Sequence, residues 1–76
     1  MEKVLSPIEC QWIMDKLSES HNPYLISMYQ HIDHKQFLIV KIIDVSGTDI
    51  KKLEDNNLSV CIFGAGTHVE LWLSKL

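Results

Sequence analysis

The segment Gln36–Val45 constrains the fold more than any other part of this sequence. Between Phe37 and Ile43 only Lys41 is polar. Alternate side chains of an extended chain point to opposite faces. One face would carry Leu38, Val40 and Ile42, and the other Phe37, Ile39 and Ile43. A strand that is apolar on both faces is typical of the centre of a sheet, so the segment predicts a central strand that is covered twice.

A second extended segment precedes this strand. Tyr24 to about His31 is rich in residues that favour strands, and Ile32–Lys35 can form the connection of a short hairpin. His21-Asn22-Pro23 lies just before it and breaks helical structure, because the residue before a proline avoids the α region. The sequence therefore predicts a hairpin that follows a helix.

That helix has a clear start signal. Ser6 is expected as the N-cap, Pro7 suits the first turn, and Glu9 completes a capping box. The helix should run from Pro7 to about Ser20. Its core stripe would consist of Cys10, Ile13, Met14 and Leu17. Ile8 and Trp12 project from the opposite, charged side, where they would be either an interface or core covered by the second hairpin.

The second half repeats the order of a helix and a hairpin. Asp49 to Asp55 predicts a short helix capped by Thr48 or Ser46, and Asn56-Asn57 suits a left-handed exit. Two further strands, Leu58–Phe63 and Thr67–Ser74, would be joined by a turn at Gly64–Gly66. In the last strand Val69, Leu71 and Leu73 alternate with His68, Glu70 and Trp72.

The elements predict one α+β domain over residues 1–76, in the order α-β-β-α-β-β. We expect a four-stranded antiparallel sheet with a longer N-terminal helix and a short second helix. A helix of this length is ~21 Å long and about 10 Å wide, and it cannot cover both faces of such a sheet. The uncovered face would collect Phe37, Ile39, Ile43, Phe63 and Trp72, with Tyr29 or Met28 depending on register. Alternatively, the two helices divide the faces and these residues are ordinary core.

The charge balance argues against phosphate ligands. Seven Lys, no Arg and ten Asp plus Glu among 76 residues give a formal net charge of −3. Nucleic-acid-binding domains usually have a basic stripe and a pI above roughly 9, which makes nucleic acid an unlikely partner. No apolar stretch approaches the ~18 residues of a membrane span, and the N-terminus lacks the apolar core of a signal peptide. We therefore expect no membrane contact and a cytoplasmic location.

Three groups of residues are candidates for a metal site, a reactive thiol or a phosphate-binding loop. His31, Asp33 and His34 offer too few ligands for structural zinc and favour a solvated polar turn. Cys61 and His68 lack an orienting third group, so a core thiol and a surface imidazole are expected. The glycines at 64 and 66 lack the lysine and the following helix of a phosphate loop. Cys10 and Cys61 are expected to be reduced and buried, with one bridge between them as the alternative. We predict no enzyme activity, no cofactor and no metal.

The leading functional hypothesis is a protein-binding module of the inhibitor, antitoxin, immunity or accessory kind, which can also form a homodimer. Lysine without arginine, together with many Ile and Asn, is typical of AT-rich bacterial or phage genes. The candidate partner-binding residues are Ile8, Trp12, Tyr29, Phe37, Phe63, His68, Glu70 and Trp72. The alternative is a binder of single-stranded nucleic acid or a small ligand that stacks on Tyr29, Phe37, Phe63 and Trp72. A cysteine or metal enzyme ranks last.

Overall fold

The predicted order of elements is confirmed. The computed structural model of the chain describes residues 4–65 and 67–76. Its elements are α1 (Pro7–Leu17), β1 (Ser27–Gln30), β2 (Leu38–Ile43), α2 (Gly47–Glu54), β3 (Leu58–Ala65) and β4 (His68–Lys75), with a 3-10 turn, η1 (Pro23–Leu25), before β1. No helix of the described residues is both long enough and apolar enough to cross a bilayer.

Capping boxes start both helices. The Ser6 side chain accepts from the Glu9 N–H at 3.2 Å, and the Ser6 N–H donates to Glu9 Oε1 at 3.1 Å. Ser46 forms the same arrangement with Asp49 at the start of α2. These side chains satisfy N–H groups that have no partner within the helix. Thr48, the other candidate cap, lies inside α2.

The first helix is shorter than predicted. It ends at Leu17 rather than near Ser20, and the Ser18 hydroxyl donates to the Met14 carbonyl at 2.7 Å. Serine side chains that bond to the backbone in this way compete with helix continuation. The following residues form a turn, in which Ser20 and His21 reach toward α2.

The sheet is antiparallel, with strand order β1-β2-β4-β3. The central place predicted for β2 is confirmed, and β4 lies beside it. Tyr29, Ile39, Trp72 and Cys61 form one cross-strand row, because Tyr29 pairs with Ile39, Ile39 with Trp72, and Trp72 with Cys61. This register places Tyr29, and not Met28, with the residues that face away from the core.

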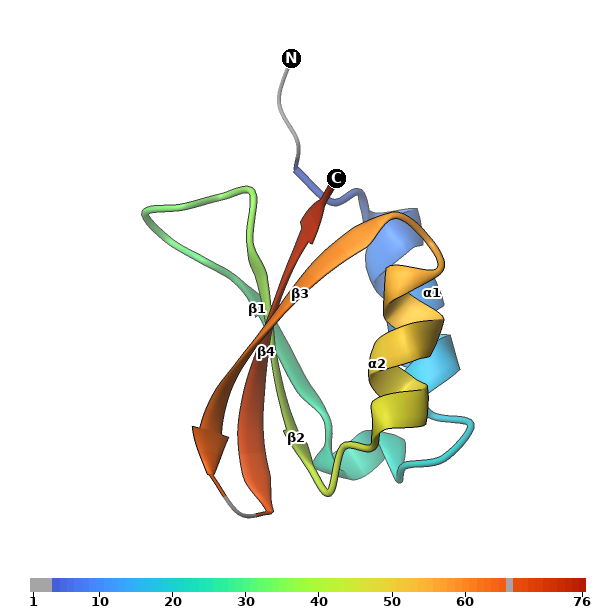
Figure 1. Cartoon of the computed structure of the whole chain (residues 1–76). Coiled ribbons are helices and arrows are strands. Elements are labelled where there is room, and N and C mark those ends of the chain that lie inside the picture. The colour runs from blue at the N-terminus through green and yellow to red at the C-terminus, as the bar shows by residue number, and fades with distance from the viewer. Residues whose placement is uncertain (1–3, 66) are drawn as a thin grey trace.

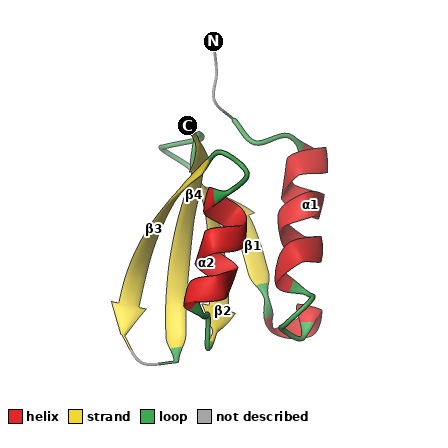
Figure 2. Cartoon of the chain, turned by 45° about the vertical axis from the view of Figure 1, so that its right-hand side comes forward, coloured by secondary structure: helices red, strands yellow, loops and turns green. Residues whose placement is uncertain are grey.

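Both helices lie on the same side of the sheet (Figures 1 and 2). They enclose one hydrophobic core between themselves and the sheet. Its buried residues are Leu5, Ile13, Leu17, Ile26, Leu38, Val40, Ile42, Leu53, Leu58, Leu71 and Leu73. The alternative in which each helix covers a different face is therefore wrong. We call the side of the sheet away from the helices the open face.

Several strand boundaries differ from the prediction. β1 begins at Ser27 rather than Tyr24, because Asn22 caps the turn Pro23–Leu25. β3 continues past Phe63 to Ala65. Gly64 has φ +115°, and a Cβ there would lie 2.8 Å from the carbonyl oxygen of His68, so the position requires glycine. Gly66, predicted to belong to the turn, lies outside the described residues.

Candidate functional site

An aromatic cluster occupies the open face, with Trp72 at its centre. The ring centroid of Trp72 lies 5.0 Å from that of His31, 5.5 Å from Phe37 and 5.2 Å from Phe63. His34 extends the cluster, 5.0 Å from His31. The tilted geometries and separations are those at which aromatic side chains attract each other. We use the name aromatic cluster for His31, His34, Phe37, Phe63 and Trp72.

The cluster is exposed at its margins and closed at its base. Phe63 is 53% exposed, and Tyr29, which lies in the same row as Trp72, is 44% exposed. Ile39 sits between Tyr29 and Trp72 in that row and is only 1% exposed. Because neither α1 nor α2 covers this face, the neighbouring side chains must themselves bury Ile39. The open face thus has a small apolar centre with half-exposed rings around it.

A Lys–Glu pair borders the aromatic cluster. Glu70 Oε1 accepts from Trp72 Nε1 at 3.1 Å, and Glu70 Oε2 lies 3.9 Å from Lys41 Nζ. Lys41 Nζ also lies 5.6 Å from the ring centroid of Tyr29, within the range of a cation–π contact. The indole N–H therefore has a partner, and the Lys41 charge is balanced by a carboxylate.

A shallow cavity of about 420 Å³ adjoins this pair. Its lining includes Leu25, Ile43, Phe63, His68 and Glu70. Apolar side chains dominate it and a few polar groups converge at its rim, which is the usual composition of a pocket that accepts one anchoring side chain or small ligand.

The predicted site residues separate into two groups. Tyr29, Phe37, Phe63, His68, Glu70 and Trp72 lie on the open face or its connections. Ile8 and Trp12 belong to α1, on the other side of the sheet (Figure 1). One flat interface cannot include both groups.

Trp12 is half-buried and packs against the hydrophobic core. Together with Ile8, Asn56 and Leu58 it lines a cavity of about 260 Å³ between α1 and the start of β3. Lys16 Nζ lies 5.7 Å from its ring. The ring is thus covered in part by the entry to the second hairpin, whereas Ile8 is 82% exposed.

The structure adds His31 and His34 to the open face, a role that was not predicted for them. His31 Nδ1 accepts from the N–H groups of Asp33 at 3.1 Å and His34 at 2.9 Å, which shapes the β1–β2 connection. His31 is an even number of residues from Tyr29, so strand alternation was the signal that could have placed it there. Within the described residues, no three His, Cys, Asp or Glu side chains are grouped so as to hold a metal.

The prediction of a buried Cys61 is wrong. Cys61 is exposed on the open face, because β3 is an edge strand and both α1 and α2 lie on the other side of the sheet. Cys10 is half-buried on α1, and burial followed by the Glu9 charge raises the pKa of its thiol. Both cysteines are free, so the alternative of a bridge between them is not realised. Cys61 pairs with Trp72 whereas His68 pairs with Ala65, so Cys61 and His68 occupy different register positions of the hairpin.

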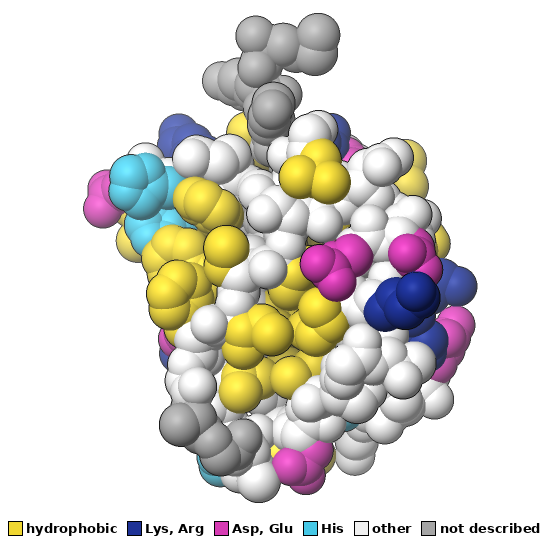
Figure 3. All heavy atoms as spheres, viewed as in Figure 1, with side chains coloured by type: hydrophobic (Ala, Val, Ile, Leu, Met, Phe, Trp, Pro, Cys, Tyr) yellow, Lys and Arg dark blue, Asp and Glu magenta, His cyan; other side chains and the backbone are white. Residues whose placement is uncertain are grey.

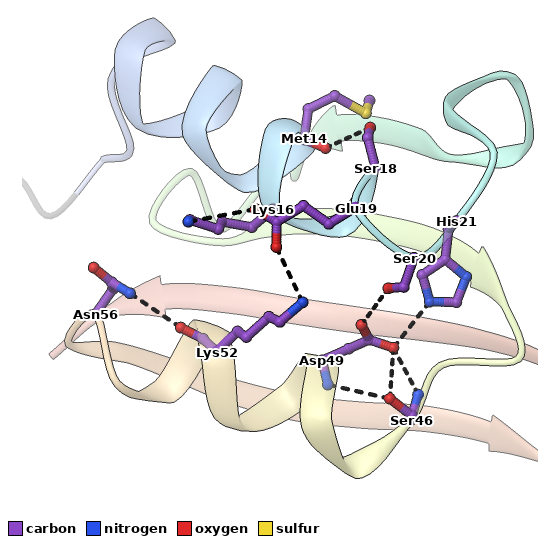
Figure 4. Close-up of polar contacts among 10 residues, drawn as sticks. All are labelled: Met14, Lys16, Ser18, Glu19, Ser20, His21, Ser46, Asp49, Lys52 and Asn56. Carbon is purple, nitrogen blue, oxygen red and sulfur yellow. Dashed lines mark hydrogen bonds and ion pairs between the residues drawn. The ribbon is translucent and has the colours of Figure 1, made fainter.

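A buried carboxylate joins the two helices on the opposite side of the sheet (Figure 4). Asp49 is 2% exposed and accepts from Ser20 Oγ at 2.8 Å, His21 Nε2 at 2.9 Å and the Ser46 N–H at 2.9 Å. Burial alone would raise the pKa of Asp49, but the hydrogen bonds from His21, Ser46 and Ser20 outweigh it and hold that pKa far below its usual value.

The polar group around Asp49 has a structural role. The hydroxyls of Ser20 and Ser46 both donate to Asp49. A histidine that activates a serine must instead accept the proton of that serine. The group therefore ties the end of α1 to the start of α2 and does not have the arrangement of a nucleophile and its base.

Comparisons with protein-family models, with curated proteins and with solved structures find no match to this chain. The assignment of function therefore depends on the chemistry of the open face.

Proposed function

We propose that this protein is a non-enzymatic protein-binding module and that the open face is its binding surface. It would act by covering a surface of another protein, as small inhibitors, antitoxins, immunity proteins and accessory proteins do. The observation that carries this proposal is the half-exposed aromatic cluster around Trp72, on the sheet face that neither α1 nor α2 covers.

The composition of the open face supports a protein partner. Aromatic residues are enriched at the energetic centres of protein interfaces, and charged groups are found mainly at their rims. Here Trp72, Phe37 and Phe63 form the centre, and the Lys41–Glu70 pair lies beside them. The adjoining cavity could accept one apolar side chain of the partner. A standard interface takes only ~800 Å² from each protein, and this chain exposes 5017 Å² in all.

A pull-down with face variants tests the proposal. Tagged wild-type protein, a Tyr29→Ser/Phe63→Ser double variant and an Ile8→Ser variant would each be used for affinity purification from the native cell, followed by mass spectrometry. Tyr29, Phe63 and Ile8 are all substantially exposed, so each variant should fold. We expect one protein to be recovered with the wild type and with Ile8→Ser but lost with the double variant. If the partner protein were lost only with Ile8→Ser, the binding surface would lie on α1 instead.

Salt dependence separates a protein partner from the alternative of single-stranded nucleic acid. Exposed rings could stack on bases, but the Lys41 charge is balanced by Glu70 and the chain carries a formal net charge of −3. Binding to nucleic acid weakens steeply as salt rises, whereas apolar contact between proteins does not. We therefore expect the complex to survive a wash at high salt. Release by salt, together with recovery of nucleic acid, would favour the alternative.

A further inference from the structure

The outer edge of β3 presents backbone hydrogen-bonding groups that point away from β4. β3 is the last strand in the order β1-β2-β4-β3, and it is eight residues long. The Leu76 N–H donates to the Asn57 carbonyl at 3.0 Å, in register with the β3–β4 ladder. Since bonded pairs alternate in an antiparallel ladder, Ser59, Cys61 and Phe63 bond to β4. The backbone groups of Leu58, Val60 and Ile62 therefore point outward.

This edge lacks the features that usually prevent pairing. Its sequence from Leu58 to Ala65, LSVCIFGA, contains no charged residue and no proline. Natural edge strands are commonly protected by charge, proline, a bulge or short length. The opposite edge, β1, is only four residues long. The two edges of the sheet thus differ in length, and β3 is the one suited to accept another strand.

Apolar side chains flank the exposed backbone of β3 on both faces. Phe63 on the open face is 53% exposed, and Ile62 on the helix side is 50% exposed. Figure 3, in the same view as Figure 1, shows hydrophobic side chains on both sides of the path that β3 follows. A strand added at this edge would cover part of both side chains while satisfying the outward N–H and C=O groups.

We propose that β3 pairs antiparallel with β3 of a second copy of this chain, forming a homodimer with one continuous sheet. A twofold axis perpendicular to the sheet makes the same strand self-complementary, and an uncharged strand brings no like charges together. The segment Leu58–Gly64 of one copy overlaps fully with the same segment of the second copy when the twofold axis passes beside Cys61. Val60 then lies opposite Ile62 of the second copy, and Cys61 opposite Cys61 of the second copy.

The dimer goes beyond the proposed function and does not depend on it. A perpendicular twofold axis keeps the helices of both copies on one side, so the two open faces become neighbours on the other side. Pairing uses the edge backbone of β3 and covers part of Phe63, whereas partner binding uses the rest of the open face around Trp72. The purified protein alone tests the dimer, so a monomeric result would refute pairing at β3 and leave the open face as a separate question.

Analytical ultracentrifugation over a concentration series gives the first test. We expect the mass to rise toward 2 × 8.8 = 17.6 kDa for the wild type. Ile62→Lys should weaken association by about tenfold or more, because it replaces an apolar side chain opposite Val60 of the second copy and brings the two added charges to diagonal positions across the interface. Tyr24→Lys adds the same charge at a 95% exposed position outside β3 and should dimerise normally. A wild type that is monomeric throughout, or a dimer that Ile62→Lys leaves intact, would overturn the proposal.

Cysteine cross-linking tests the register. In a Cys10→Ser background, Cys61 is the remaining cysteine. The two Cys61 residues would form a non-hydrogen-bonded pair with Cα atoms about 4.5 Å apart, within the range that a disulfide spans. Diamide, which oxidises two thiols to a disulfide, should therefore give covalent dimer in this background but not after the further change Ile62→Lys. Equal cross-linking with and without Ile62→Lys would contradict pairing at β3.

Discussion

At the scale of single residues, Ile39 and Phe63 lie on the same face of the sheet but differ in burial. Ile39 is 1% exposed although α1 and α2 lie on the other side of the sheet, whereas Phe63, on the edge strand, is 53% exposed. The difference arises from neighbours in the sheet, since Ile39 has Tyr29 and Trp72 on either side. The open face is therefore part core and part surface.

These positions predict different effects on stability. Ile39→Ala should lower the free energy of unfolding by about 2–5 kcal/mol, because it removes buried methyl groups and leaves a cavity. Phe63→Ser should cost only about 0.5–1.5 kcal/mol, because the ring is half exposed and loses mainly its contact with Trp72. Urea denaturation of both variants measures this. A large loss for Phe63→Ser would mean that the ring belongs to the core of the monomer and is not free for a partner.

Asp49 gives a prediction about pH. Its folded-state pKa is lowered, so the unfolded chain takes up a proton more readily, and the stability due to Asp49 is present above about pH 4 and lost as pH falls further. Asp49→Asn should cost about 1–3 kcal/mol at pH 7 by weakening buried hydrogen bonds. The difference between wild type and variant should shrink between about pH 5 and pH 2. Urea denaturation at each pH measures it, and a difference that stays constant would contradict the account.

Sequence reasoning found some of these residues and missed others for identifiable reasons. Alternation in β4 correctly separated Leu71 and Leu73 from Trp72, because strand periodicity is local. The contact between His21 and Asp49 was not predicted, since it depends on how the two helices meet across 28 positions of sequence. The apolar neighbours of Cys61 in the sequence predicted a core position. A local run of apolar residues does not reveal that the strand lies at the edge of the sheet, where side chains are exposed.

At the scale of elements, the helix caps and the left-handed exit after α2 were the most predictable features. Ser6 and Ser46 start α1 and α2 as capping boxes, and Asn57, at φ +61°, provides the left-handed exit after α2. The end of α1 and the start of β1 were less predictable, because serine side chains and the 3-10 turn at Pro23–Leu25 compete there with regular structure.

Gly64 and Gly47 form a matched pair for testing the β3–β4 hairpin. Gly64→Ala should destabilise the protein by roughly 1–3 kcal/mol, because Gly64 has φ +115° and its added Cβ would meet the backbone oxygen of His68. Gly47→Ala has open space and begins α2, so it should be neutral or stabilise by up to about 1 kcal/mol. Thermal denaturation of both measures this. Similar melting temperatures for the two variants would contradict the strained geometry at Gly64.

At the scale of the whole molecule, the decisive feature is that both helices occupy one side of the sheet (Figure 2). The sequence predicted the element order and which residues of β2 and β4 share a face, whereas for β1 it left Tyr29 and Met28 as alternatives. Which side each helix takes depends on long-range packing that no local pattern encodes, and α1 and α2 lie together over the core.

The central claim is that a partner protein covers the open face. Hydroxyl-radical footprinting with mass spectrometry, on the free protein and on the complex isolated from the native cell, tests it most directly. We predict that binding reduces oxidation of Tyr29, Phe63 and Trp72 and leaves that of Ile8 unchanged. Oxidation of Tyr29, Phe63 and Trp72 that is the same in the complex and in the free protein would contradict the claim.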